Sequence, residues 1–332
     1  MRTFILFLPC LALLTACGKP AAQGGFSAGI VFDVGGIDDK SFNESANKGL
    51  MKAKAELGVD AERCEPAQPA DRKGGLRRLC GQRTALVIGV GFIFKEEIIA
   101  AAKDFPDLKF ACVDMDPVPD APKNLVALIF REEQGAFLVG AIAGLCTKTK
   151  KVGFIGGMNI PLIHKFEAGF CAGVKHVAPD AEIFVNYAGV TPDAFRDPEK
   201  GKSMALGQYQ SGADIIFHAS GKTGLGVFQA AKEADKLAIG VDADQYREAP
   251  GHILTSMIKR VDVAVFDAIK SAKEGTFQGG TRVFGLKEEG IGFVYDDNNK
   301  KLIPEEVYKK VMDLRQQIID GKIAVPEKPE KK

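Results

Sequence analysis

The sequence lacks the short motifs that mark most metal, redox and hydrolase sites. Its seven cysteines include no C-x-x-C pair, which argues against a zinc site and against a disulfide framework. The four histidines show no metal-ligand spacing, and the G-x-S-x-G nucleophile turn is missing. We therefore expect no metal ion, no cofactor and no catalytic residues, and hence a protein that is not an enzyme.

Charge of one sign and long hydrophobic runs are also scarce. The formal net charge of the 332 residues is +1 with both signs interspersed, which gives no support for a nucleic-acid partner. After the N-terminal apolar segment, no stretch of the roughly 20 residues that a transmembrane helix needs is free of charge. With 46% hydrophobic and 26% charged residues, the chain is typical of a soluble globular protein of about two domains. We expect it to be a monomer.

The first residues have the layout of a cleaved export signal. A positive charge precedes an apolar run from Phe4 to Leu14, and small residues lead from there to Cys17. Leu-Thr-Ala-Cys resembles the lipobox of bacterial lipoproteins, which predicts a signal peptide at 1–16, a lipid on Cys17 and a flexible tether at 17–25. The lipid would hold the protein on a membrane of the cell envelope, facing the periplasm or the exterior. The alternative is an ordinary signal peptide with an incidental cysteine.

Short β-branched runs alternate with helical periodicity from Phe26 onward, which favours parallel sheets covered by helices in two α/β lobes. The expected strands are 28–32, 85–90, 109–113, 126–130, 152–155, 183–187, 215–218 and 237–241, with a further strand near Leu254. The expected helices are 41–58, 94–104, 133–147, 162–177, 198–211, 224–235 and 259–274. A last helix, between Pro304 and Gly321, carries an apolar stripe that should dock on a lobe.

Two local features allow more than one structure. The apolar run 135–145 is too short for a membrane span, so a buried helix packed closely through its glycines is the better interpretation. Cys64 and Cys80 could form a disulfide after export. Cys112 and Cys171 lie in apolar segments, which is more typical of packed thiols.

Three predicted strands end in an aspartate, at Asp33, Asp114 and Asp242. The carboxyl ends of the strands in an open α/β sheet line the crevice where ligands bind. A carboxylate there can accept several hydrogen bonds from neutral hydroxylated or imino ligands. Each aspartate could instead cap the following helix, but the occurrence of three favours residues of a ligand cleft.

The segment after Asp33 predicts a tight turn into a helix. Ser41-Phe-Asn-Glu44 has the pattern of a capping box, and the diglycine 35–36 permits the turn before it. Phe42 and Asn43 would then lie near the cleft. A ring that stacks and an amide that reads an edge suit a flat heterocycle, although Phe42 could equally pack within its own lobe.

Two further segments could reach the crevice. The turn 219–226 contains Gly-Lys-Thr but lacks the upstream glycine of a P-loop, so a phosphate site is not expected. Its backbone N–H groups and the helix N-terminus could still bind neutral polar groups. Lys259 begins another helix, where it could extend into the cleft or remain solvated.

Five segments together resemble one known family. They are Asp33–Asn43, Leu86–Phe92, Glu133–Gly144, Ile239–Gln245 and Ser256–Arg260, in order between about residues 27 and 320. On these segments the chain is similar to the basic membrane protein family of substrate-binding lipoproteins. The resemblance implies a type I periplasmic-binding-protein fold: two Rossmann-like lobes joined by three crossovers, with a ligand cleft between them. Members of the family typically bind purine nucleosides for ABC importers.

The resemblance also implies which residues contact the ligand. Carried over position by position, they are Asp33, Phe42, Asn43, Asp114, Phe195, Gly221, Asp242 and Lys259. Phe42 and Phe195 would sandwich the base. Asp242 or Asn43 would read its edge. The segment 190–195 carries extra residues relative to the family pattern, which makes Phe195 the weakest match.

The ribose and the transporter complete what the resemblance implies. Asp114, Gly221 and Lys259 would contact the ribose, and the closed protein would dock on an ABC permease. The expected division of the chain is lobe 1 at 26–130 and 258–290, lobe 2 at 131–257 and 291–322, and a tail at 323–332.

Three other functions remain open on the sequence. The same fold could bind another heterocycle such as riboflavin, or report a ligand to a membrane sensor. The segment 33–39 also partly resembles the aspartate cluster of calcium-dependent nucleoside hydrolases, which hold Ca²⁺ with clustered carboxylates. Position 31 is valine, however, so the paired Asp-x-Asp start is missing, and helix capping explains Asp38 and Asp39.

Overall fold

The computed structural model describes residues 25–68 and 70–330. The predicted signal peptide, Cys17 and nearly all of the predicted tether lie outside these described residues. Within the described part of the chain, no helix is both long enough and apolar enough to cross a membrane.

The first of two sheets is parallel throughout and has the strand order β11-β5-β4-β3-β1-β2. Its strands are β1 (Ser27–Val31), β2 (Asp60–Cys64), β3 (Leu86–Val90), β4 (Lys109–Val113), β5 (Leu125–Phe130) and β11 (Gly280–Phe284). Helices α1 (Phe42–Leu57) and α8 (Val261–Lys273) cover one face, and α2 (Asp71–Gly81) and α3 (Lys95–Asp104) cover the other. We call this half of the molecule lobe 1.

The second sheet has the order β12-β10-β9-β8-β6-β7, and only β12 runs antiparallel to its neighbour. Its strands are β6 (Lys151–Met158), β7 (Glu182–Gly189), β8 (Ile215–Ala219), β9 (Leu237–Asp242), β10 (Ile253–Lys259) and β12 (Ile291–Phe293). Helices α4 (Glu132–Cys146) and α5 (Pro161–Val177) cover one face, and α6 (Pro198–Gln210) and α7 (Gly224–Ala234) cover the other. This half is lobe 2.

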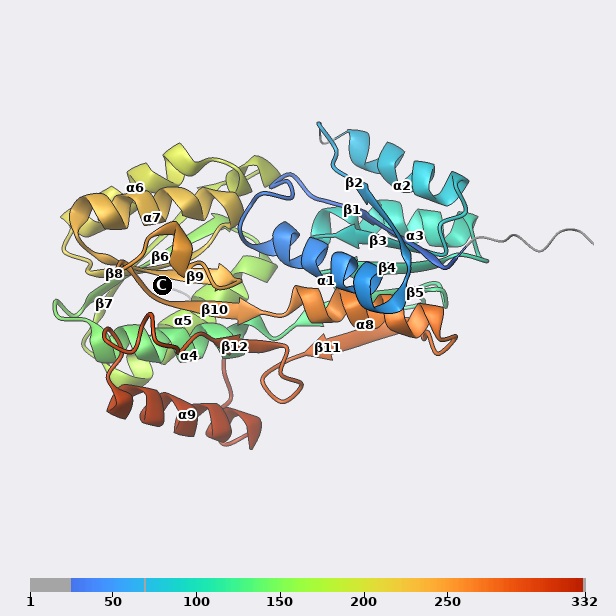
Figure 1. Cartoon of the computed structure of the whole chain (residues 1–332). Helices are drawn as coiled ribbons and strands as arrows, with labels where there is room; N and C mark the ends of the chain where they lie inside the picture. Colours follow the sequence, from blue (N-terminus) through green and yellow to red (C-terminus); the bar gives the residue numbers. More distant parts are fainter. Residues whose placement is uncertain (1–24, 69, 331–332) are drawn as a thin grey trace, which may run out of the picture.

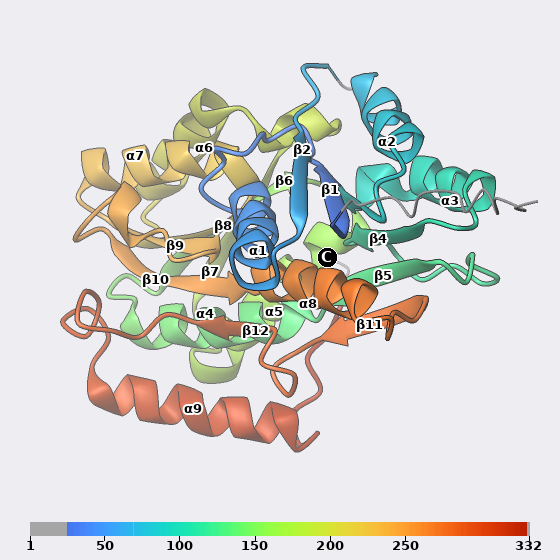
Figure 2. The same ribbon diagram turned by 45° about the vertical axis from the view of Figure 1, so that its right-hand side comes forward.

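The chain passes between the lobes at three neighbouring places. They follow β5, β10 and β11, so that lobe 1 receives α8 and β11 after lobe 2 has begun. The crossovers are tied together: the rings of Phe130 and Phe284 stack at 5.1 Å, Arg131 N–H donates to the Phe284 carbonyl, and Arg260 N–H donates to the Gly290 carbonyl. Figures 1 and 2 show the two sheets side by side with the crossovers between them.

Close helix packing accounts for the apolar run in α4. A Cβ on Gly140 would collide with the backbone of Phe170 in α5, and a Cβ on Gly173 would collide with the backbone of Phe137. Glycine therefore lets the two helix backbones touch, which confirms the prediction of a buried helix packed through glycines. Helix α9 (Glu305–Ile319) lies on α4 through the expected stripe, Val307, Val311, Leu314 and Ile318, which is buried.

Edge strands account for most of what the sequence did not predict. Strands β2, β11 and β12 lie at the borders of their sheets, where one side of a strand faces no partner and a continuous apolar run is not required. Strand β2 carries Asp60, Glu62 and Arg63 for this reason. Helix α2 was also missed, because its polar sequence with a Gly-Gly pair has weak helical periodicity. Cys64 and Cys80 are both free thiols, so the possible disulfide between them is not formed.

Candidate ligand-binding cleft

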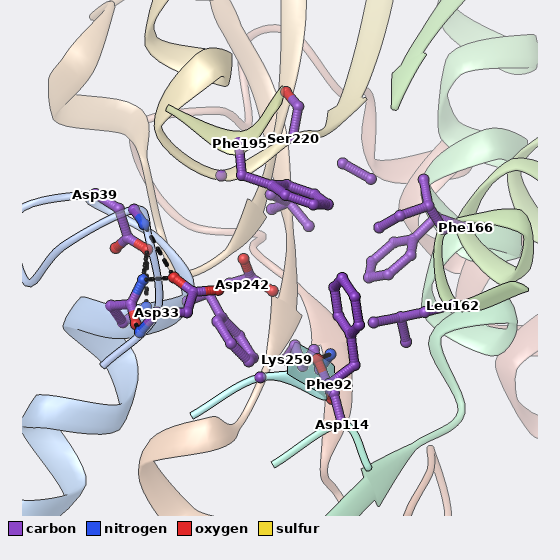
Figure 3. A pocket seen from close by; sticks show the side chains of 18 residues that line it. Asp33, Asp39, Phe92, Asp114, Leu162, Phe166, Phe195, Ser220, Asp242 and Lys259 are labelled. Atoms are coloured by element: carbon purple, nitrogen blue, oxygen red, sulfur yellow. Dashed lines mark hydrogen bonds and ion pairs between the residues drawn. The ribbon is translucent and has the colours of Figure 1, made fainter. Parts of the chain in front are cut away.

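A cavity of about 570 Å³, including its opening to solvent, lies between the carboxyl ends of the strands of the two lobes. All eight residues expected to bind ligand line it: Asp33, Phe42, Asn43, Asp114, Phe195, Gly221, Asp242 and Lys259. The first four come from lobe 1, and the other four from lobe 2 or its crossover. Their contact with a ligand stays a prediction. Figure 3 shows the carboxylates at the sides and floor and the phenylalanine rings around the space between them.

A compact hydrogen-bond network shapes the lobe 1 wall. The side chain of Asn43 donates to Asp33 Oδ1 at 2.6 Å and to Asp39 Oδ2 at 2.9 Å, and its own oxygen accepts the Asp33 backbone N–H. Asp33 also accepts the N–H of Gly35 in the turn that follows β1. Burial raises the pKa of the Asp33 carboxyl, while the bonds from Asn43 and Gly35 oppose that rise. This wall is therefore held in place within its own lobe.

The residue that caps α1 is Asp39, and the expected capping box at Ser41 is wrong. Asp39 accepts backbone N–H groups from Ser41, Asn43 and Glu44, whereas the Ser41 side chain makes no cap hydrogen bond. One carboxylate three residues before the first residue of the helix accepts several of the N–H groups at its start. This leaves the Ser41 hydroxyl free to donate across the cleft to Asp242.

Asp242 and Asp114 both have backbones in the left-handed region. Their φ angles are 66° and 59°, an uncommon conformation for residues other than glycine, although aspartate tolerates it better than most. Each residue lies at the end of a strand, β9 or β4, and its side chain lines the cavity. Strain of this kind persists where the surrounding structure holds it, often at ligand sites. Burial raises the pKa of both carboxyls.

A buried ion-pair cluster forms the floor of the cavity. Lys259 Nζ lies 2.7 Å from Asp114 Oδ2 and 2.9 Å from Glu132 Oε1, and it is surrounded by the rings of Phe42, Phe130 and Phe166 at 5.0–5.7 Å. Although burial alone lowers the pKa of a lysine, Asp114, Glu132 and Asp242 together raise the pKa of Lys259 above its usual value. The lysine therefore lies in the cleft and is charged, and the alternative of a solvated side chain is excluded.

The turn after β8 contributes backbone rather than charge. Ser220 and Gly221 line the cavity, and Gly221 has a φ of 54° at the start of the short 3-10 helix η3 (Gly221–Thr223) that leads into α7. Phe195 ends another such helix, η2 (Pro192–Phe195), and its ring lies so close to Gly157 that a Cβ there would collide with it. The extra residues before Phe195 have therefore not moved it out of the cleft.

Sequence reasoning missed several residues of the cavity wall. Phe92 comes two residues after β3 ends, so the strand-end argument could have found it. Leu162 and Phe166 come from α5 in lobe 2, where an apolar residue looks like any other core position. No three acidic, histidine or cysteine side chains among residues 25–68 and 70–330 are grouped to hold a metal ion.

Comparison with known proteins finds relatives of one family along nearly the whole chain. The family model described as ABC transporter substrate-binding protein PnrA-like matches residues 26–329. The CD4+ T-cell-stimulating antigen of Listeria monocytogenes is 40% identical over 99% of both chains. The ABC transporter nucleoside-binding protein BmpA of Lactococcus lactis is 35% identical over 97% of both. Basic membrane protein A of Borreliella burgdorferi is 35% identical, over 98% of this chain and 95% of its own.

Solved structures give the corresponding result for the fold. An ABC transporter solute-binding protein from Aeropyrum pernix K1 superimposes with a TM-score of 0.82 and 31% identity, covering 92% of this chain and 94% of its own. A second, from Conexibacter woesei, has a TM-score of 0.72 and 25% identity, covering 91% and 99%. These neighbours confirm the expected type I periplasmic-binding-protein fold. The chain belongs to the basic membrane protein family of ABC-transporter substrate-binding proteins.

Proposed function

We propose that this substrate-binding protein holds a purine nucleoside between its two lobes. The observation that carries the proposal is that Phe42 and Phe195, from opposite lobes, line one cavity together with Asp33 and Asn43. Two rings suit the faces of a flat base, and carboxylate and amide groups suit the N–H groups on its edge. One relative is named a nucleoside-binding protein, which also supports the proposal.

The floor of the cavity suits the hydroxyl groups of a ribose. Asp114 Oδ1 is buried and has no hydrogen-bond partner within the described residues. A buried acceptor without a donor costs free energy, so a ligand hydroxyl that donates to this oxygen would be favoured. The Lys259 ammonium, beside the same carboxylate, could donate to a second ligand oxygen.

Contacts between the lobes support binding by closure. Ser41 of lobe 1 donates to Asp242 of lobe 2, and Gln245 Nε2 of lobe 2 donates to the Lys40 carbonyl at 3.0 Å. A ligand that touches both walls adds its own contacts to the closed state and so shifts the population toward it. The closed protein would then dock on an ABC permease while a lipid on Cys17 tethers it outside the cytoplasmic membrane.

Calorimetric titration of the mature, delipidated protein tests the ligand. The protein is unfolded and refolded to remove bound ligand, and then titrated with guanosine, inosine, adenosine and riboflavin. We expect one-to-one binding of at least one nucleoside without release of free base, which chromatography of the mixture would detect. Heat with riboflavin alone would overturn the nucleoside assignment, and free base would indicate a hydrolase.

A further inference from the structure

Glu132, the first residue of α4, is a buried carboxylate that does not line the cavity. Its side chain is 0% exposed. Oε1 lies 2.9 Å from Lys259 Nζ, and Oε2 lies 3.2 Å from Lys165 Nζ. Glu132 is thus behind the floor of the cavity, whereas Asp114, the other carboxylate on Lys259, faces into it. The ammonium of Lys259 therefore lies between the carboxylates of Asp114 and Glu132.

This carboxylate lies where the chain crosses between lobes. Glu132 comes two residues after β5 ends in lobe 1, and Lys259 is the last residue of β10 before the chain returns to lobe 1. Lys165 of α5 also donates to the carbonyl of Phe130, the final residue of β5. Ionic contacts therefore join the floor of the cavity to two of the three crossovers and to α5.

A contribution to folding stability does not by itself explain why a charged Glu132 is buried at this position. Removing two charges from water costs free energy that their attraction often fails to offset, so a buried ion pair is weak evidence for stabilisation. The three phenylalanine rings around Nζ favour a cation but fix no direction for its N–H groups. Asp114 supplies a direction by accepting a hydrogen bond from Nζ, and the charge of Glu132 holds the ammonium from 2.9 Å on another side; of these two carboxylates, only Asp114 lines the cavity.

We propose that Glu132 is a positioning residue for ligand recognition, which holds the Lys259 ammonium at the floor of the cavity so that Asp114 and Lys259 together meet the hydroxyl groups of the ligand. Lys165 balances the charge of Glu132 on the side away from the cavity. Without Glu132, the ammonium is free to rotate toward Asp114 Oδ1 or Asp242 and to occupy the acceptors that the ligand needs. This inference rests on the proposed ligand class for the choice of probe.

Calorimetry on Glu132→Gln, with Glu133→Gln as the matched control, tests the inference. Glu133 is the next residue, is equally buried and interacts with Arg131 instead of Lys259. We expect E132Q to weaken guanosine binding about tenfold or more, the size of coupling found between buried charged neighbours, and E133Q to weaken it much less. In the Lys259→Met background, E132Q should change the affinity by no more than about twofold, because its effect acts through Lys259.

A second readout separates positioning from loss of structure and needs no ligand. In protein with isotope-labelled lysine ammonium groups, NMR should show a Lys259 signal protected from exchange in the native protein and in E133Q, and a shifted or missing signal in E132Q. Thermal melting is measured first, to check that E132Q is folded like the native protein. If it does not fold, Glu132→Asp, which keeps the charge, takes its place and is expected to retain the protected signal with weaker binding.

The outcomes are distinct. If the native protein binds no nucleoside but E132Q still alters the Lys259 signal, the proposed ligand class fails and the positioning of Lys259 stands. If the native protein binds guanosine and E132Q binds as E133Q does, or if E132Q and K259M are simply additive, the positioning role is overturned.

Discussion

The two walls of the cleft are built in different ways. In lobe 1, Asp33, Asn43 and Asp39 satisfy one another and the start of α1, so this part of the wall needs no contact with lobe 2. In lobe 2, the carboxylate of Asp242 has its side-chain partner across the cleft, in Ser41. If the proposed closure is right, we expect the ligand to meet the preformed wall of lobe 1 first and the wall of lobe 2 to reach its final arrangement only on closing.

Replacing Asp242 should have the largest effect on binding. Asp242→Ala removes the acceptor for Ser41 and also the acceptor that we propose for the ligand, so we expect both recognition and closure to be weakened. We expect affinity for nucleoside to fall by about 100-fold or more, as for other buried charged hydrogen bonds, with the fold intact. Calorimetry measures the affinity, and circular dichroism checks that the fold is intact. Asp244 is an exposed aspartate two residues further on, so Asp244→Ala is the control and should bind normally. Unchanged affinity in Asp242→Ala would refute the proposed role of the Asp242 carboxylate.

Asn43 tests whether the lobe 1 wall is preformed. Asn43→Ala removes the amide that lies between two buried carboxylates, Asp33 and Asp39. We expect the free energy of unfolding to fall by about 2–3 kcal/mol, because both acceptors lose a donor and face each other. Denaturant titration without ligand measures it. Adding Asp33→Asn, which removes one of the two facing charges and leaves an oxygen to accept the Gly35 N–H, should recover part of the loss. A double variant no more stable than Asn43→Ala would count against this network.

The sequence predicted that the strand-end aspartates would lie at the cleft, and they line the cavity, because a strand and its polar terminus are local features. Asp33, Asp114 and Asp242 lie where the alternation of elements placed them, and the family resemblance added Phe195 and Gly221. Glu132 and Phe166 were missed because their roles depend on which helix lies beneath which strand. Ser41 shows a second limit. Asp39 and Ser41 both precede α1 and could both cap it. Only the contact of Ser41 with Asp242 in lobe 2 shows why Asp39 caps the helix and Ser41 does not.

His218, in β8 of lobe 2, should make the stability of the protein depend on pH. The side chain is fully buried beside Ser220 and Phe228, and burial lowers the pKa of His218 to about 4. Its folded pKa lies below the unfolded value, so its contribution to stability is present above pH 6.5 and is lost as the pH falls toward 4. Between pH 7 and about pH 5 this loss amounts to about 2 kcal/mol.

The measurement compares the native protein with His218→Gln by denaturant unfolding at several pH values. We expect the variant to gain about 2 kcal/mol relative to the native protein as the pH is lowered from 7 to about 5, whatever its stability at pH 7. A constant difference between His218→Gln and the native protein would mean that His218 is not held neutral by burial.

Ser41 should have the smallest effect, and the most specific one. Its hydroxyl donates to Asp242 but does not line the cavity, so Ser41→Ala weakens the closed state without removing a ligand contact. The loss of one hydrogen bond to a charged group, about 1.5 kcal/mol, predicts an affinity lower by about tenfold and by the same factor for every ligand, because apparent affinity scales with the closed population. Ser203→Ala, exposed on α6, is the control. Calorimetry with guanosine, inosine and adenosine measures the factor, and small-angle scattering measures closure at saturation. A factor that differs between ligands would show that Ser41 takes part in recognition, and the separation between a wall that recognises and a contact that closes would no longer hold.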